Sequence, residues 1–137
     1  MNIFCTDRFK IEFEKLLSKK QYRTLKQDFI KYFFNKKIEE LLSGTNLNNS
    51  KETPYIKKRL RGSGGYRFYF LILIKEENLY LMFLHPKTGP YGAPNINNES
   101  KAMLYKDILE KIKSDELFTV TYTNKELLFT EYAPGKE

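Results

Sequence analysis

Cysteine and histidine are almost absent from this 137-residue chain, which has one of each, Cys5 and His85, and no tryptophan. A single cysteine excludes an internal disulfide and a zinc site built from several cysteines. A single histidine means that any chemistry that needs an imidazole must use His85. Acidic residues are scattered through the helical segments at the spacing of a solvent face, so they predict no carboxylate-rich metal site. We therefore expect neither a metal nor another cofactor.

Long hydrophobic runs are also missing. No window approaches the 18 apolar residues of a membrane span, and the charged residues 7–10 are not followed by the apolar segment of a signal peptide. We expect a cytoplasmic protein with no membrane partner. The chain is 41% hydrophobic and 15% aromatic, which is rich enough in core-forming residues to predict one folded domain over residues 1–137.

The first third of the chain is predicted to be mainly helical. After a short strand at 3–5, apolar residues follow the helical period of 3.6 from Phe9 to Leu17. The pattern pauses at 18–20, resumes from Tyr22 to Leu42, and ends at Ser43-Gly44. This interruption favours two antiparallel helices over one long helix.

The rest of the chain is predicted to be mostly strand. After a loop at 44–54, the period changes to two, and we expect strands at 55–61, 66–75 and 79–86. Residues 66–74 and 79–84 are apolar on both faces, so we expect these to be central strands that are covered on each side. A loop at 87–98 and a helix to about residue 113 follow, and 117–132 forms either a closing hairpin or one strand and a tail. The predicted fold class is α+β: an N-terminal helical hairpin on a twisted, mainly antiparallel sheet, with an additional helix and a C-terminal strand or hairpin.

Positive charge is concentrated around the first of these strands. The chain has a net charge of +7, and residues 51–67 hold six basic side chains and one acidic one, Glu52. Strand alternation places Lys57, Arg59 and Arg61 on one face with Tyr55, and Arg67 begins the next strand nearby. One interpretation is a solvated edge strand, since edges carry lysine to prevent pairing with other sheets. We favour an anion-binding surface, because edge protection needs neither three cations nor arginine.

Two features beside this strand also have two interpretations. The segment Gly62-Ser63-Gly64-Gly65 contains the glycines of a phosphate-binding loop, but a strand follows where such a loop needs a helix. A hairpin turn is therefore the better prediction. His85 ends a strand, where it is either a structural hydrogen-bonding group or a catalyst beside an irregular loop. No serine near it supports a catalytic triad.

The run Lys57-Lys-Arg-Leu-Arg61, the glycine turn and the segment Gly65-Tyr-Arg-Phe-Tyr69 resemble the RelE/HigB superfamily of bacterial toxins. The resemblance covers residues 2–113. It implies a helical hairpin followed by a twisted sheet whose concave face carries basic residues. It also implies metal-independent cleavage of mRNA, with the ribosome as a partner, and neutralisation by an antitoxin.

The resemblance also implies roles for individual residues. Lys57 and Arg59 match the basic residues of the family's second strand, and Arg67 matches the arginine of the next strand. His85 takes the place of a histidine used by some HigB-type members. The implied catalytic residues are Lys57, Arg59, Arg67 and His85, and the implied RNA-binding residues are Lys58, Arg61, Lys87 and Tyr91.

Two alternatives remain open on the same scaffold. The chain could be a non-catalytic module that binds RNA, or one that binds a protein as gyrase-inhibiting toxins do. The basic face could also serve mainly to receive an acidic antitoxin helix, which is compatible with cleavage.

Overall fold

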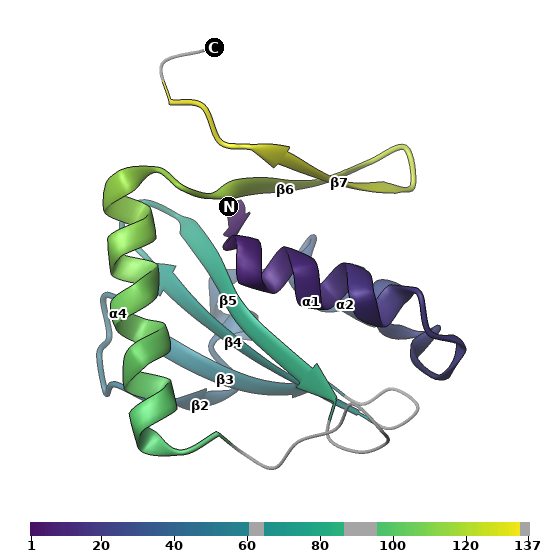
Figure 1. Ribbon diagram of the computed structural model, residues 1–137. Coiled ribbons are helices and arrows are strands. Elements are labelled where there is room, and N and C mark those ends of the chain that lie inside the picture. Colours follow the sequence, from purple (N-terminus) through teal and green to yellow (C-terminus); the bar gives the residue numbers. More distant parts are fainter. Residues whose placement is uncertain (61–64, 87–95, 135–137) are drawn as a thin grey trace.

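The computed structural model describes residues 1–60, 65–86 and 96–134, and these form an α+β fold built on one seven-stranded sheet (Figure 1). The predicted fold class is thus confirmed at this level. In spatial order the sheet is β2-β3-β4-β5-β1-β6-β7. The strands are β1 (Asn2–Cys5), β2 (Thr45–Asn46), β3 (Tyr55–Leu60), β4 (Tyr66–Leu73), β5 (Asn78–Pro86), β6 (Phe118–Thr123) and β7 (Glu126–Glu131).

The sheet is mixed and larger than the one predicted. β1 lies between β5 and β6, parallel to β5 and antiparallel to β6, whereas the other neighbouring pairs are antiparallel. The insertion of β1 joins the central strands to the C-terminal hairpin and so extends the sheet. β2 was not predicted, because its two residues lie within a segment of loop composition.

The helices of the described chain are α1 (Asp7–Leu17), α2 (Leu25–Phe33), α3 (Ile38–Leu41) and α4 (Asn98–Ser114), with one 3₁₀ turn at Lys20–Tyr22. The predicted second helix was expected to continue to Leu42, but α2 ends at Phe33. Asn35 has a left-handed backbone with φ 64°, a conformation that an α-helix cannot continue. None of these helices has the length and apolar surface needed to cross a bilayer.

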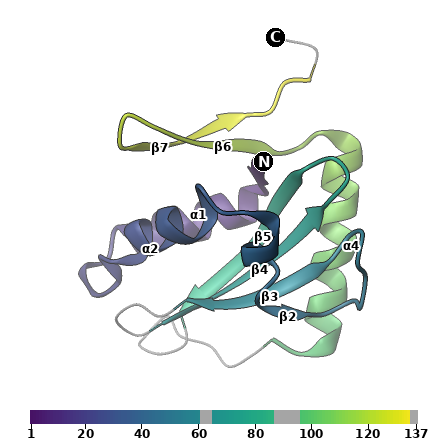
Figure 2. The same cartoon turned by 180° about the vertical axis from the view of Figure 1, so that it is seen from behind.

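Each face of the sheet is covered by helices (Figures 1 and 2). α1 and α2 cover one face, where the Phe68 ring of β4 lies 6.2 Å from Phe9 and 5.9 Å from Phe29. α4 covers the other face, where Leu104 and Ile108 belong to the same buried cluster as strand residues such as Leu71. The prediction that the central strands are covered on both sides is therefore confirmed.

Local signals explain where α1 and α4 begin. The Thr6 hydroxyl accepts a hydrogen bond from the Phe9 backbone N–H at 3.2 Å, and the Asn97 amide oxygen accepts one from Ser100 at 2.8 Å. These side chains cap amide groups that have no partner within the helix.

Of the two structures predicted for residues 117–132, the closing hairpin is the one observed, and β6 and β7 are its strands. Asn124 and Lys125 turn with positive φ, as a two-residue hairpin loop requires.

We expect Gly44→Ala to destabilise the fold by about 1–3 kcal/mol. A Cβ at Gly44 would overlap the Lys57 carbonyl oxygen and lie 2.7 Å from Cγ2 of Ile56. The backbone that leads into β2 would therefore have to move away from β3. Thr45→Ala, at the exposed neighbouring position, is the matched control and should have a small effect. Urea denaturation of both variants measures the difference, and equal stabilities would contradict the close packing at Gly44.

Candidate functional site

Strand register brings predicted site residues together on the face that α4 partly covers. Arg59 of β3 is paired with Arg67 of β4, and Arg67 is paired with His85 of β5. Directly opposite residues have Cβ atoms about 4.5–5.5 Å apart, so these three form a continuous row across three strands. Lys57 lies two residues before Arg59, opposite Tyr69, and therefore shares the same face.

The alternation of β3 explains why the cations share this face. Ile56 and Leu60 belong to the core beneath α1 and α2, so the alternate residues Tyr55, Lys57 and Arg59 point toward α4. Tyr55, whose hydroxyl is bonded to α4, is buried, whereas Lys57 is partly exposed and Arg59 is exposed. Exposure therefore increases from Tyr55 to Arg59 along this face of β3, which leaves the cations accessible to a ligand.

α4 contributes a fourth cation, Lys101, which the sequence analysis missed. The Tyr55 hydroxyl donates a hydrogen bond to the Lys101 backbone oxygen at 3.1 Å, which holds the start of α4 against the site. Lys101 itself gave no signal in the sequence, because a single lysine in an amphipathic helix usually faces solvent. We call Lys57, Arg59, Arg67 and Lys101 the basic cluster.

The electrostatics of Lys57 reflect this crowding. Burial lowers the pKa of the Lys57 ammonium, and the positive charges of Arg59, Lys101 and Arg67 lower it further. Burial is the larger of these two causes. A lowered pKa increases the fraction of Lys57 that is a neutral amine, so Lys57 is better suited to accept a proton than a solvated lysine.

His85 is buried within the row, with 3% of its surface exposed. Its ring stacks on Tyr69 at 6.0 Å between centroids, and Nδ1 lies 3.0 Å from the Pro86 carbonyl oxygen. A carbonyl only accepts hydrogen bonds, so Nδ1 carries the hydrogen and the neutral ring has its lone pair on Nε2. Nε2 hydrogen bonds to none of the residues in the described ranges. Burial, and to a lesser degree the charge of Arg67, lowers the pKa of His85, which keeps the ring neutral near pH 7.

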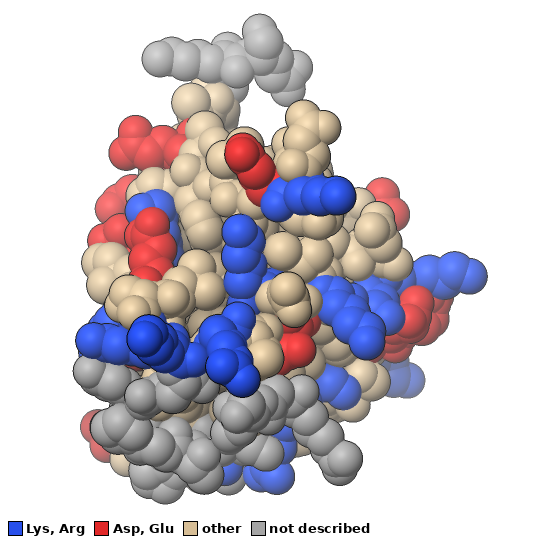
Figure 3. All heavy atoms as spheres, turned by 90° about the vertical axis from the view of Figure 1, so that its right-hand side faces the viewer, with Lys and Arg blue, Asp and Glu red and all other residues tan. Residues whose placement is uncertain are grey.

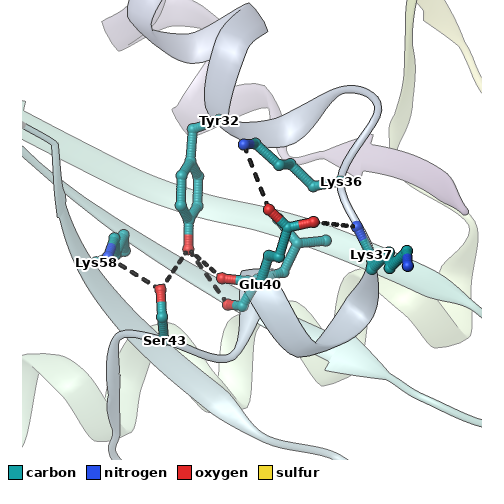
Figure 4. A network of polar contacts seen from close by, with 7 residues as sticks. Tyr32, Lys36, Lys37, Glu40, Ser43 and Lys58 are labelled. Atoms are coloured by element: carbon teal, nitrogen blue, oxygen red, sulfur yellow. Dashed lines mark hydrogen bonds and ion pairs between the residues drawn. The ribbon is translucent and has the colours of Figure 1, made fainter.

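Lys58 does not join the basic cluster. It points to the opposite face of the sheet, where its Nζ donates a hydrogen bond to Ser43 Oγ at 3.0 Å and lies 5.3 Å from the centre of the Tyr32 ring (Figure 4). The Tyr32 hydroxyl reaches the same Ser43 oxygen at 3.4 Å and the Glu40 backbone oxygen at 3.3 Å. This network joins α2, α3 and β3, which gives Lys58 a structural role.

Three other predicted RNA-binding residues, Arg61, Lys87 and Tyr91, lie outside the described residues. Lysine and arginine side chains extend across the middle of the face shown in Figure 3. Over the described ranges, no three His, Cys, Asp or Glu side chains are grouped as a metal site would need.

No model of a known protein family matches the chain, and no curated protein matches it in sequence. The function is therefore inferred from the residues of this site.

We expect His85→Phe to remove one source of acid sensitivity. Because the folded pKa is lowered, the unfolded chain takes up the His85 proton first as pH falls below about 6.5. Folded wild type therefore loses stability below that pH, by at most about 1.4 kcal/mol per pH unit from this group. Above that pH both states are neutral and the group contributes no pH dependence. Phenylalanine keeps an aromatic ring beside Tyr69 and does not titrate.

Urea denaturation of both proteins at pH 7.5 and pH 5 tests this. The loss of stability on acidification should be smaller in His85→Phe than in wild type. His85 is the only histidine in the chain, so no other imidazole can obscure the difference. An identical loss in the two proteins would show that the buried ring does not titrate as argued.

Proposed function

We propose that this chain is a RelE/HigB-type toxin, an endoribonuclease that cleaves ribosome-associated mRNA without a metal ion and is neutralised by an antitoxin in the cytoplasm. The observation that carries the proposal is the row of Arg59, Arg67 and His85, with Lys57 on the same face. The described parts of the motif that resembles the family, residues 57–60 and 66–69, lie on β3 and β4, two of the three strands that form this row. Helices precede those strands in the chain, as the resemblance implies.

The basic cluster has the groups that RNA cleavage through the 2′-hydroxyl requires. In this reaction the 2′-oxygen forms a bond to the adjacent phosphorus, and the bond from phosphorus to the 5′-oxygen of the next nucleotide breaks. Negative charge increases on the phosphoryl oxygens in the transition state, and fixed cations there lower the barrier. We assign Arg67 to this role, with Arg59 beside it, because a guanidinium group presents two parallel donors to a phosphate.

The reaction also moves two protons, one from the 2′-hydroxyl and one to the departing 5′-oxygen. Lys57 is our candidate for the base, because its lowered pKa favours the neutral amine and its side chain is partly exposed. His85 offers a second proton acceptor through the lone pair on Nε2. Its burial means that RNA can reach it only after the residues around the ring move. The group that takes up the 2′-proton becomes a cationic acid, and this acid can give a proton to the departing 5′-oxygen.

The burial of His85 also favours a second candidate function. A basic face with a shielded histidine suits a module that binds RNA, or a partner protein in the manner of gyrase-inhibiting toxins, without cleavage. The two candidate functions predict different RNA lengths after incubation, because only a nuclease shortens the RNA. Binding alone leaves the RNA intact, and its retention weakens as salt screens the cations.

The antitoxin in this proposal is an acidic segment that covers the basic cluster. Carboxylates on such a segment would pair with the same guanidinium groups that bind phosphate. Such a segment would therefore compete with RNA for the site. The same residues of this chain would then determine both RNA binding and neutralisation by the antitoxin.

We expect expression of the wild-type chain alone to arrest bacterial growth, and Arg67→Ala to relieve the arrest. Loss of one positioned donor to a transition-state anion typically lowers the rate about 10²- to 10³-fold. Arg23→Ala is the matched control, because Arg23 is an exposed arginine in the α1–α2 connection and should remain toxic. Growth curves with immunoblots of protein level measure both. Full toxicity in Arg67→Ala would refute the assigned site.

Cleavage itself is tested with purified protein and ribosome-bound mRNA in a buffer that keeps the Mg²⁺ of the ribosome, and separately with free RNA in the presence of EDTA. We expect fragments that end in a 2′,3′-cyclic phosphate, because the attacking 2′-oxygen remains bonded to phosphorus. Mapped RNA ends identify the product. Intact RNA with salt-sensitive retention would support the binding module instead.

A further inference from the structure

A shallow pocket of about 300 Å³ lies beside the basic cluster, between the sheet and the first turns of α4. Its lining includes Leu47, Asn48, Tyr55, Asn98, Lys101 and Tyr105. Its volume is at the lower end of the range for small-ligand sites, about 300–1,000 Å³. The pocket combines aromatic surface with one cation, and the reaction proposed above does not use it.

Two stacked tyrosines form one wall of this pocket. The rings of Tyr55 and Tyr105 are 5.6 Å apart between centroids, with 13° between their planes. Tyr55 is 3% exposed, whereas Tyr105 is only partly buried and keeps accessible surface. The buried ring and its hydrogen bond to the Lys101 backbone hold the outer ring in place. A ring fixed in this way is a platform on which a planar group can stack.

The pocket adjoins the basic cluster directly. Tyr55 lies two residues before Lys57 on the same face of β3, and Lys101 belongs both to the cluster and to the pocket lining. The positive charge of Lys101 contributes to the lowered pKa of Lys57, and the Lys101 backbone is hydrogen bonded to Tyr55 on the same face. A phosphodiester bound at Lys57, Arg59 and Arg67 would therefore place the adjoining nucleotide near Lys101 and Tyr105.

We propose that this pocket binds one nucleotide of single-stranded RNA next to the cleaved linkage, with its base on Tyr105 and its phosphate at Lys101. The inference rests on the proposed function and adds to it a binding site for the nucleotide beside the cleaved linkage. An aromatic platform beside a cation is the arrangement that binds unpaired bases, and a base in a duplex is not free to stack there. An acidic peptide would use Lys101 but would leave the tyrosine platform without a role.

The test measures affinity separately from cleavage. The probe is a fluorescent single-stranded hexanucleotide of randomised sequence with 2′-O-methyl groups, which lacks the attacking hydroxyl and is not cleaved. We expect Tyr105→Leu to weaken binding about fivefold or more, the lower end of what stacking of one base contributes. Tyr105→Phe keeps the ring and should bind as wild type does. Lys101→Gln should weaken binding and reduce the slope of log affinity against log salt by about 0.7.

Two matched variants control for general effects. Lys106→Gln removes the same charge from an exposed position of α4, and Tyr122→Leu removes a partly buried tyrosine of β6 that packs on Phe34. Both should bind the probe with wild-type affinity. Fluorescence anisotropy at several salt concentrations gives the affinities, and circular dichroism shows that each variant is folded.

The outcomes separate this inference from the proposed function. If Tyr105→Leu and Lys101→Gln bind as wild type does while natural RNA is cleaved, the pocket inference is overturned and the nuclease proposal stands. If both variants lose affinity but wild type cleaves no RNA, the pocket is supported and the nuclease proposal fails. If wild type binds no probe but binds an acidic peptide, both are overturned in favour of a protein partner.

Discussion

The pairing of β3, β4 and β5 is the constraint on which the candidate site depends. Their register holds Arg59 against Arg67, an arrangement of like charges that is unfavourable by itself. The alternate residues of the same strands offset this cost, because Ile56, Phe68 and Leu84 are buried beneath α1 and α2. The apolar face of these strands thus fixes where the charges of the other face lie. An anion bound between the arginines would relieve the repulsion.

α4 determines how much of that face remains available. Its buried residues Leu104 and Ile108 pack over one part of the sheet, and Tyr55 holds the Lys101 backbone beside the cations. The helix therefore does two things: it completes the second core and adds a positive charge to the cluster. Beyond Tyr55 along β3, Lys57 is partly exposed and Arg59 is exposed.

Burial and charge act together on the two groups that could move protons. Burial lowers the pKa of both Lys57 and His85, and the charge of Arg67 lowers both further. The two differ in accessibility, since Lys57 is partly exposed and His85 is 3% exposed. The same cations that attract a phosphate thus favour the neutral forms needed to accept a proton. Whether RNA can reach His85, more than the pKa of either group, distinguishes the proposed nuclease from a binding module.

The sequence by itself determined the features that depend on neighbouring residues. Periodicity predicted α1, the start of α2, α4, the three strands from 55 to 86 and the two-sided cover of the sheet, and alternation put Lys57 and Arg59 on one face. Local patterns carry no information on pairing between distant segments, so only the tertiary structure decided that β1 inserts parallel to β5 and that Lys101 joins the cluster. The tertiary structure also sent Lys58 to Ser43 and Tyr32 and buried His85, because those outcomes depend on packing between elements.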